Sequence, residues 1–436
     1  MAVYWYPRVP TRAGASPIAT IIRKHCMDVS RIQSYLRDQG FDGWLLYNFR
    51  DLNPIAISVA GLDSGGSRRW FLWIPAQGAP RWLVHGIEGH MFNQADETLQ
   101  GERLRYVSWQ EMASMLPKLL ALDGKRAPKI VMEYSPGNAI PFISRIDAGI
   151  KEVVEQATGA EIHSSADVAQ LALAVLSDEQ VASHRRAAEI CLTTKDRAFD
   201  FIARQLRQGA DVTEYDVQQF IAQQFAQSGM EPLPCIVAVN AHAADPHYFP
   251  TAADHSPIRE GDMVLIDLWT KERDNPQASM ADSTWTAYCG KVVPAKVKEV
   301  FEVVAAGRDR AVEFIQERFA AGQPVHGHEV DNVTREVISD AGYGPYFIHR
   351  TGHSLGPTGH YLGVNIDNLE TEDQRVLLPG LMFTIEPGIY IPDLNFDDSP
   401  TPKGLGIRSE INCLVHADRL EVTTLPVQTE VRPLLA

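Results

Sequence analysis

The stretch MVLIDLW, residues 263–269, and the later stretch ADSTW, residues 281–285, decide the fold of the second half of this chain. Each belongs to a β-type run that holds one acid, and the polar loop 271–279 lies between them. A hairpin of the two runs would bring Asp267 and Asp282 together. Alternate side chains of a strand point to opposite faces, so Asp267 shares its face with apolar side chains and needs a partner. Two close carboxylates repel unless a proton or a cation lies between them.

Two further acids end or interrupt apolar runs later in the chain. Glu386 lies in MFTIEPGIY and Glu410 lies in GIRSEINCLV. A lone acid at such a position is read most simply as the polar end of a strand, but four acids in this setting are hard to explain as solvated surface. His353 in HRTGHSLG adds an imidazole. Four carboxylates with one histidine form an oxygen-rich set of ligands that suits manganese, cobalt or zinc.

The chain has 436 residues, which is enough for two domains of common size. Its first part mixes helix and strand signals, as expected for an α/β domain, and holds no cluster of chemically reactive residues. A long helix that begins after Ser177 marks the hinge into a second domain. The pattern predicts helices at 29–39, 177–206, 213–227, 295–319 and 327–341, and strands at 43–47, 70–74, 81–84, 129–133 and 236–239.

Composition excludes several classes of protein. The formal net charge of -15 and the lack of a basic stripe argue against a nucleic-acid surface. The five cysteines are odd in number, scattered and never spaced as CxxC, which predicts neither a disulfide framework nor a thiolate zinc site. No apolar run reaches the length that spans a bilayer. We therefore expect a protein of the cytoplasm with no membrane and no nucleic-acid partner.

These motifs resemble the creatinase and Xaa-Pro peptidase family of the prolidase and aminopeptidase P branch. The resemblance implies an α/β creatinase-like domain over residues 1–175, followed by an α+β catalytic domain with the pita-bread fold over residues 176–436. It implies a homodimer and two divalent metal ions, with Mn2+ preferred and Zn2+ or Co2+ as alternatives. It also implies five metal ligands, which are Asp267, Asp282, His353, Glu386 and Glu410.

The same resemblance assigns roles around the metals. Glu386 is the implied general base, and His247 in ADPHYFP and His360 are implied to contact substrate and to stabilise the oxyanion. His349 corresponds to the position that contacts the proline side of the substrate, and Arg408 to an arginine that orients a bridging glutamate or the substrate carboxylate. The implied reaction is hydrolysis of the peptide bond before proline by a metal-bridging hydroxide. The substrate is a dipeptide or a short peptide, as in an Xaa-Pro dipeptidase or aminopeptidase.

Two other readings of the same fold stay open. One is a metal-free, creatinase-like amidinohydrolase, and the other is a non-catalytic binding protein on the pita-bread fold. Relatives of both kinds replace or lose ligands, whereas all five are present here. Two departures from the family pattern are the longer loop after Leu268-Trp269 and Trp285, where many relatives carry an arginine. We expect both to affect substrate length and preference rather than metal binding.

Overall fold

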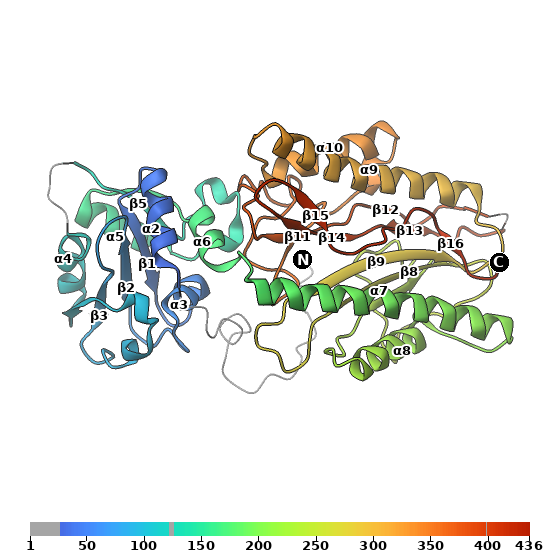
Figure 1. Cartoon of the computed structure of the whole chain (residues 1–436), viewed down its shortest axis with the longest axis horizontal. Coiled ribbons are helices and arrows are strands. Elements are labelled where there is room, and N and C mark those ends of the chain that lie inside the picture. The colour runs from blue at the N-terminus through green and yellow to red at the C-terminus, as the bar shows by residue number, and fades with distance from the viewer. Residues whose placement is uncertain (1–26, 122–125, 398) are drawn as a thin grey trace. The chain divides into compact units, whose positions relative to one another are not determined.

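The computed structural model describes residues 27–121, 126–397 and 399–436. The chain divides into two compact units, the first ending at Leu173 and the second spanning Ala174–Ala436 (Figure 1). Cys26 and the segment before Val29, to which the sequence assigns no role, lie outside the described residues apart from Met27 and Asp28. Within the described residues, no helix is both long and apolar enough to cross a membrane.

A six-stranded sheet forms the centre of the first unit, in the order β4-β3-β2-β1-β5-β6. Strand β2 pairs antiparallel with β1 and β3, whereas the pairs β1–β5, β3–β4 and β5–β6 are parallel. Helices α4 and α5 cover one face of the sheet, and α2, α3 and α6 cover the other (Figure 1). The strands are β1 (Gly43–Asn48), β2 (Trp70–Pro75), β3 (Arg81–His85), β4 (Glu102–Tyr106), β5 (Lys129–Met132) and β6 (Glu161–Ser164).

The helices of this unit begin at residues that suit a helix start. Asp28, Asn53, Ser108 and Asp147 each accept a hydrogen bond from a backbone N–H in the first turn of the helix that follows. The predicted α/β class is confirmed. The helices are α2 (Val29–Asp38), α3 (Pro54–Ala60), α4 (Trp109–Leu120), α5 (Ala148–Thr158) and α6 (Ala166–Leu173), with 3-10 turns at Met91–Gln94, Glu97–Leu99, Pro136–Asn138 and Pro141–Ile143.

A buried carboxyl in this unit makes its stability depend on pH. Glu133 is 0% exposed and accepts hydrogen bonds of 2.6 Å from Trp44 Nε1 and from Asn53 Nδ2. Burial outweighs these donors and raises the pKa of Glu133 to about 7. The folded state therefore keeps a proton that the unfolded chain loses at lower pH. Its stabilising contribution is full below the unfolded pKa and is lost as the pH rises through the folded pKa.

We expect the free energy of unfolding of this unit to fall between about pH 5 and pH 8, and Glu133→Gln to remove this part of the fall. Urea unfolding of both proteins at both pH values, followed by tryptophan fluorescence, measures the change in the free energy of unfolding. The same pH dependence in both proteins would assign the effect to another group.

The second unit begins with two well-capped helices. Ser177 and Gln180 form a reciprocal capping box at the start of α7 (Asp178–Arg207), and Thr213 and Asp216 do the same for α8 (Glu214–Gln227). The later helices are α9 (Ala295–Ala320) and α10 (Gly327–Asp340), followed by a 3-10 turn at Gly344–Tyr346. The helices predicted for this half of the chain are confirmed to within a residue or two.

Two four-stranded sheets and a two-stranded pair complete the unit. Helix α7 packs on β8 and β9, whereas α9 packs on β12, β13 and β15, so the strands lie between helical layers (Figure 1). This is the α+β architecture that the sequence predicts. The first sheet has β7 (Ile236–Val239), β8 (Met263–Thr270), β9 (Ala281–Tyr288) and β16 (Arg432–Pro433); the second has β10 (Ser354–Leu355), β11 (Met382–Ile385), β14 (Ile411–Val415) and β15 (Leu420–Val422); the pair is β12 (Gly388–Ile391) and β13 (Leu405–Arg408).

The predicted hairpin of the two acid-bearing runs is confirmed. Strands β8 and β9 pair antiparallel, with Asp267 opposite Thr284 and Trp269 opposite Asp282. Residues directly opposite each other share a face, and so do residues two apart along a strand. Asp267 and Asp282 therefore lie on the same face of the sheet.

Candidate metal centre

Neighbouring strands bring the four predicted acids to one place. Glu386 directly follows β11 and Glu410 directly precedes β14, and these two strands pair with Ile385 opposite Ile411. The backbone N–H of Glu410 donates to Thr284 O on β9 over 3.3 Å. The pairing thereby joins the second sheet to the hairpin that carries the two aspartates.

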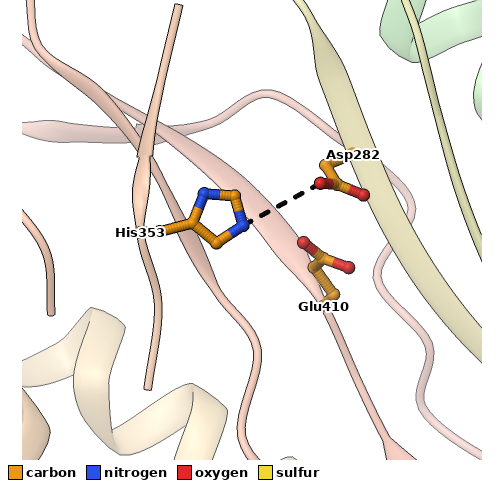
Figure 2. A group of neighbouring side chains, drawn as sticks. All are labelled: Asp282, His353 and Glu410. Atoms are coloured by element: carbon orange, nitrogen blue, oxygen red, sulfur yellow. Dashed lines mark ion pairs between the residues drawn. The ribbon is translucent and has the colours of Figure 1, made fainter. Parts of the chain in front are cut away.

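Side chains from three separate segments point toward one another at this place (Figure 2). One ligand atom each from Asp282, His353 and Glu410 lies within 4.8 Å of the others, which is a spacing that one metal ion can bridge. His353 Nε2 is 3.9 Å from Asp282 Oδ2 and 3.2 Å from Glu386 Oε1. The backbone N–H of His353 donates to Thr384 Oγ1 over 2.9 Å, which holds the histidine segment against β11.

Arg408 supplies the buried cation of the cluster. Its guanidinium forms an ion pair with Asp267, donates to Thr284 Oγ1 over 2.9 Å, and lies 3.8 Å from Glu386 Oε2. Thr284 in turn donates to Glu410 Oε2 over 2.8 Å. Arg408 therefore contacts Asp267 directly and reaches Glu410 only through Thr284. Its side chain is buried, with 5% of its surface exposed, and its donors face Asp267, Thr284 and Tyr390.

The acids carry more negative charge than this cation balances. Burial raises the pKa of Asp282 well above its ordinary value, and the charges of Asp267 and Glu386 raise it further. Burial and then the charge of Asp282 do the same to the pKa of Glu410. Among the described residues, Asp282 Oδ1 and Glu410 Oε1 are buried with no hydrogen-bond partner. Buried carboxylate oxygens without donors, beside an imidazole nitrogen, fit divalent cations of the manganese, cobalt or zinc type.

The predicted substrate histidines lie in different settings. His349 Nε2 is 2.7 Å from the Tyr390 hydroxyl, and burial, with Arg408 nearby, lowers the pKa of His349 to about 3. The ring of His360 is centred 4.2 Å from that of His353, and this neighbour together with burial lowers the pKa of His360 to about 3. His247 lies on an exposed loop, but its charge lowers the pKa of both His349 and His360.

Several residues of the centre escape a reading of the sequence alone. Thr284 and Thr384 lie two positions from Asp282 and Glu386, so the alternation of side chains along a strand could have pointed to both. Tyr390 joins the centre because β12 pairs with β13, which places it opposite Gly406. No short-range signal in the sequence predicts that pairing.

A buried glutamate anchors the loop that carries His247. Glu214 is the first residue of α8, where the helix dipole favours an anion, and it is 0% exposed. Its carboxylate accepts from Val239 N and Tyr248 OH over 2.7 Å each and from Ser256 N over 2.6 Å, and lies 3.0 Å from His242 Nδ1. These partners span the whole segment around His247.

Replacing Glu214 by Gln is expected to lower kcat/KM for the implied Xaa-Pro substrate about tenfold or more. Two partners of Glu214 lose their acceptor, and the His247 loop shifts. Tyr248→Phe removes one donor and is expected to have a smaller effect. Steady-state kinetics on both variants, with bound metal measured in parallel, tests this. Wild-type kinetics in Glu214→Gln would mean that other contacts position the loop.

One expectation from the sequence needs correction. Trp285 pairs with Ile266, so it lies on the face of β9 opposite to the acids, where Lys195 Nζ of α7 lies 3.4 Å from its ring centre. A side chain on that face cannot act on substrate preference by contact. The longer loop is different, because Lys271 donates to Pro357 O over 3.0 Å and Met280 N to Gly356 O over 2.8 Å, close to the segment of His360. Its effect on substrate length stays a prediction.

Known proteins resemble this chain in sequence. The chain is 29% identical over 253 residues to an uncharacterised peptidase of Staphylococcus aureus (strain MW2), which covers 57% of this chain and 62% of that protein. It is 29% identical over 216 residues to the Xaa-Pro dipeptidase of Lactobacillus delbrueckii subsp. lactis, covering 50% of this chain and 53% of that protein. These matches thus span less than two thirds of the curated relatives' own lengths.

Solved structures extend the likeness to the whole fold. The crystal structure of dipeptidase PepE from Mycobacterium ulcerans matches with a TM-score of 0.64 at 20% identity, over 97% of this chain and 100% of that chain. The predicted fold, an α/β domain followed by a pita-bread domain, is confirmed. The model of metallopeptidase family M24 matches residues 182–417, which include the four acids and the histidines of the candidate metal centre. The chain therefore belongs to metallopeptidase family M24.

Proposed function

We propose that this protein is a peptidase that hydrolyses the peptide bond before proline. It uses two divalent metal ions, and Mn2+ is the metal that we propose for both. The proposed ligands are Asp267, Asp282, His353, Glu386 and Glu410. The observation that carries the proposal is the pair of buried, unpartnered carboxylate oxygens of Asp282 and Glu410 within reach of His353. A structural role leaves such an arrangement of buried acids unexplained, because burying uncompensated charge is costly.

The chemistry that such cations supply is Lewis-acid polarisation of the scissile carbonyl and acidification of water. Glu386 is the proposed general base, which takes a proton from the attacking water and passes it to the departing proline nitrogen. Thr384 donates to Glu386 Oε1 over 3.0 Å and holds this carboxylate in place. Asp267 is oriented by its ion pair with Arg408.

Both of these buried histidines, His349 and His360, are proposed to act as neutral rings. Their lowered pKa values keep both rings neutral near pH 7. His349 donates its one N–H, on Nδ1, to Arg350 O over 2.7 Å, so its Nε2 accepts from the Tyr390 hydroxyl. His360 can donate its N–H to an oxyanion without bringing a charge. We propose that His360 and His247 stabilise the oxyanion, and that His349 with Tyr390 contacts the proline side. An amide to proline has no N–H, so selectivity must come from contacts with the ring.

A direct assay tests this function and decides its finer form. Protein refilled with Mn2+ is offered an Xaa-Pro dipeptide, an Xaa-Pro-Pro tripeptide, an Xaa-Ala dipeptide and creatine. Cleavage before proline, with little cleavage of the Xaa-Ala control, is expected. The ratio of dipeptide to tripeptide cleavage separates a dipeptidase from an aminopeptidase. Urea release from creatine alone, or no turnover of any substrate, would contradict the proposal.

The assembly and the location remain part of the proposal. By resemblance to the family, we propose a homodimer in the cytoplasm that acts on short proline-containing peptides. Sedimentation equilibrium of the metal-loaded protein measures the first point, and a mass of one chain at all concentrations would contradict it.

A further inference from the structure

The first unit contains a cavity of about 630 Å³ beside the carboxyl ends of three strands of its sheet. Its walls include residues at the carboxyl ends of β1, β3 and β4, namely Tyr47, His85 and Tyr106. The helices α4 and α5, which begin at Trp109 and Ala148, present their positive N-terminal ends on the same side. In open α/β sheets, the crevice outside the carboxyl ends of the strands is where ligands bind. A volume of this size suits a small molecule.

Two polar side chains of this cavity, Tyr47 and Arg69, can reach a bound molecule. Tyr47 is only 4% exposed, yet its hydroxyl makes no hydrogen bond to any described residue. The side chain of Arg69 lines the same cavity and has the Tyr106 side chain as a hydrogen-bond partner. The neighbouring Tyr106 donates its hydroxyl to Arg69 O over 2.6 Å. The Tyr47 hydroxyl is not one of the buried oxygen atoms without a partner, so it is accessible from the cavity and can bond to water or to a ligand there.

The charges and the apolar walls indicate the kind of ligand. Arg68 and Arg69 contribute two cations, and the guanidinium of Arg68 bonds only within its own segment, to Ser67. Asp147 is the acid of the cavity, and it accepts from Ile150 N over 2.9 Å as the cap of α5. Glu88 accepts from Arg68 N over 3.0 Å and lies close enough for the Arg68 charge to lower its pKa, so Arg69 is the cation left to pair with a bound carboxylate. Apolar side chains line the rest, namely Phe49, Val107, Trp109, Ile150 and Val153.

We infer that the first unit binds a small organic carboxylate with an apolar or aromatic body at this cavity. The carboxylate pairs with Arg69 and accepts from the Tyr47 hydroxyl, and the body packs between Phe49, Val107 and Trp109. This site belongs to the first unit alone and does not rest on the proposed peptidase function. Two sources supply such a carboxylate, a simple organic acid or a free amino acid, and an amino acid could also place its ammonium against Asp147.

Calorimetric titration of the full, metal-loaded chain tests the site with defined probes. Phenylacetate is the anionic probe, phenylacetamide is its neutral counterpart and L-phenylalanine is the zwitterion. We expect phenylacetate to bind at least about tenfold more tightly than phenylacetamide, since the amide cannot pair with Arg69. L-phenylalanine binding more tightly than phenylacetate would support the site with an amino acid as its ligand, and the reverse order would support it with a simple acid.

Variants separate this cavity from other surfaces. Arg69→Gln is expected to weaken phenylacetate binding about tenfold or more, and Tyr47→Phe to weaken it less, because it removes only one hydroxyl. Arg81→Gln is the matched control, because Arg81 lies at the amino end of β3, whereas the cavity lies at its carboxyl end. Unchanged thermal unfolding shows that each variant folds. The inference is overturned if no probe binds, if the neutral amide binds as well as the acid, or if Arg69→Gln and Tyr47→Phe both bind like wild type.

Discussion

Hydrolysis of an Xaa-Pro substrate is expected to fall about 10²- to 10⁴-fold when Glu386 is replaced by Gln, with the fold preserved. The carboxylate lies 3.2 Å from His353 Nε2 and accepts from Thr384 over 3.0 Å. An amide of the same size keeps the packing but cannot take a proton from water or hold a cation as well. The loss is therefore expected mainly in kcat. His353→Ala is expected to have a comparable effect, because it removes the imidazole of the centre.

Single-turnover and steady-state kinetics with added Mn2+ measure this loss, and circular dichroism reports on the fold. Glu336→Gln is the matched control, because Glu336 is an exposed acid on α10. The control is expected to retain wild-type kinetics. A Glu386→Gln protein with wild-type activity would remove Glu386 from the mechanism, whereas equal losses in both variants would point to a general effect of lost charge.

The second large effect concerns stability with and without metal. Replacing Asp282 by Asn is expected to stabilise the metal-free protein above neutral pH and to abolish most of the stabilisation that Mn2+ gives. In the folded, metal-free state the raised pKa of Asp282 means that ionisation costs free energy, through burial and through repulsion by Asp267 and Glu386. Stability conferred by this group is full below its unfolded pKa and is lost as the pH rises through the folded pKa. Asn has no such ionisation.

With metal added, the wild-type protein is expected to become more stable than Asp282→Asn. A ligand at a hundred times its Kd stabilises the folded state by about 2.7 kcal/mol per site, so the wild-type protein is expected to gain strongly from Mn2+ if the proposed ligands hold it. The Asn variant is expected to gain much less. Differential scanning calorimetry at pH 8, on chelated and refilled samples, measures both effects, with Asp418→Asn as the control because that side chain is 78% exposed. An equal Mn2+ shift in wild type and Asp282→Asn would remove Asp282 from the set of metal ligands.

The elements that sequence patterns predicted well are those with local physical causes. Helix α7 runs from Asp178 to Arg207, close to its predicted bounds, because a capping box at Ser177 starts it and Gln208-Gly209 ends it. The hairpin β8–β9 followed from two β-type runs and a polar loop between them. Trp285 was expected to affect substrate preference because many relatives carry an arginine there. That comparison does not tell which face of the strand the side chain occupies. The register of β9 decides that.

The sequence by itself determined which segments form helices or strands, the two-part organisation, and the acids and histidines that are candidate site residues. Propensity, capping and alternation, on which these predictions rest, act within a few residues of one another. Only the tertiary structure decided which of these groups meet. Arg408 and Asp267 pair across 141 positions, Tyr390 lies beside His349 through the pairing of β12 with β13, and Tyr47 and Arg69 line one cavity. Such contacts depend on how distant strands and helices pack, and no window of neighbouring residues contains that information.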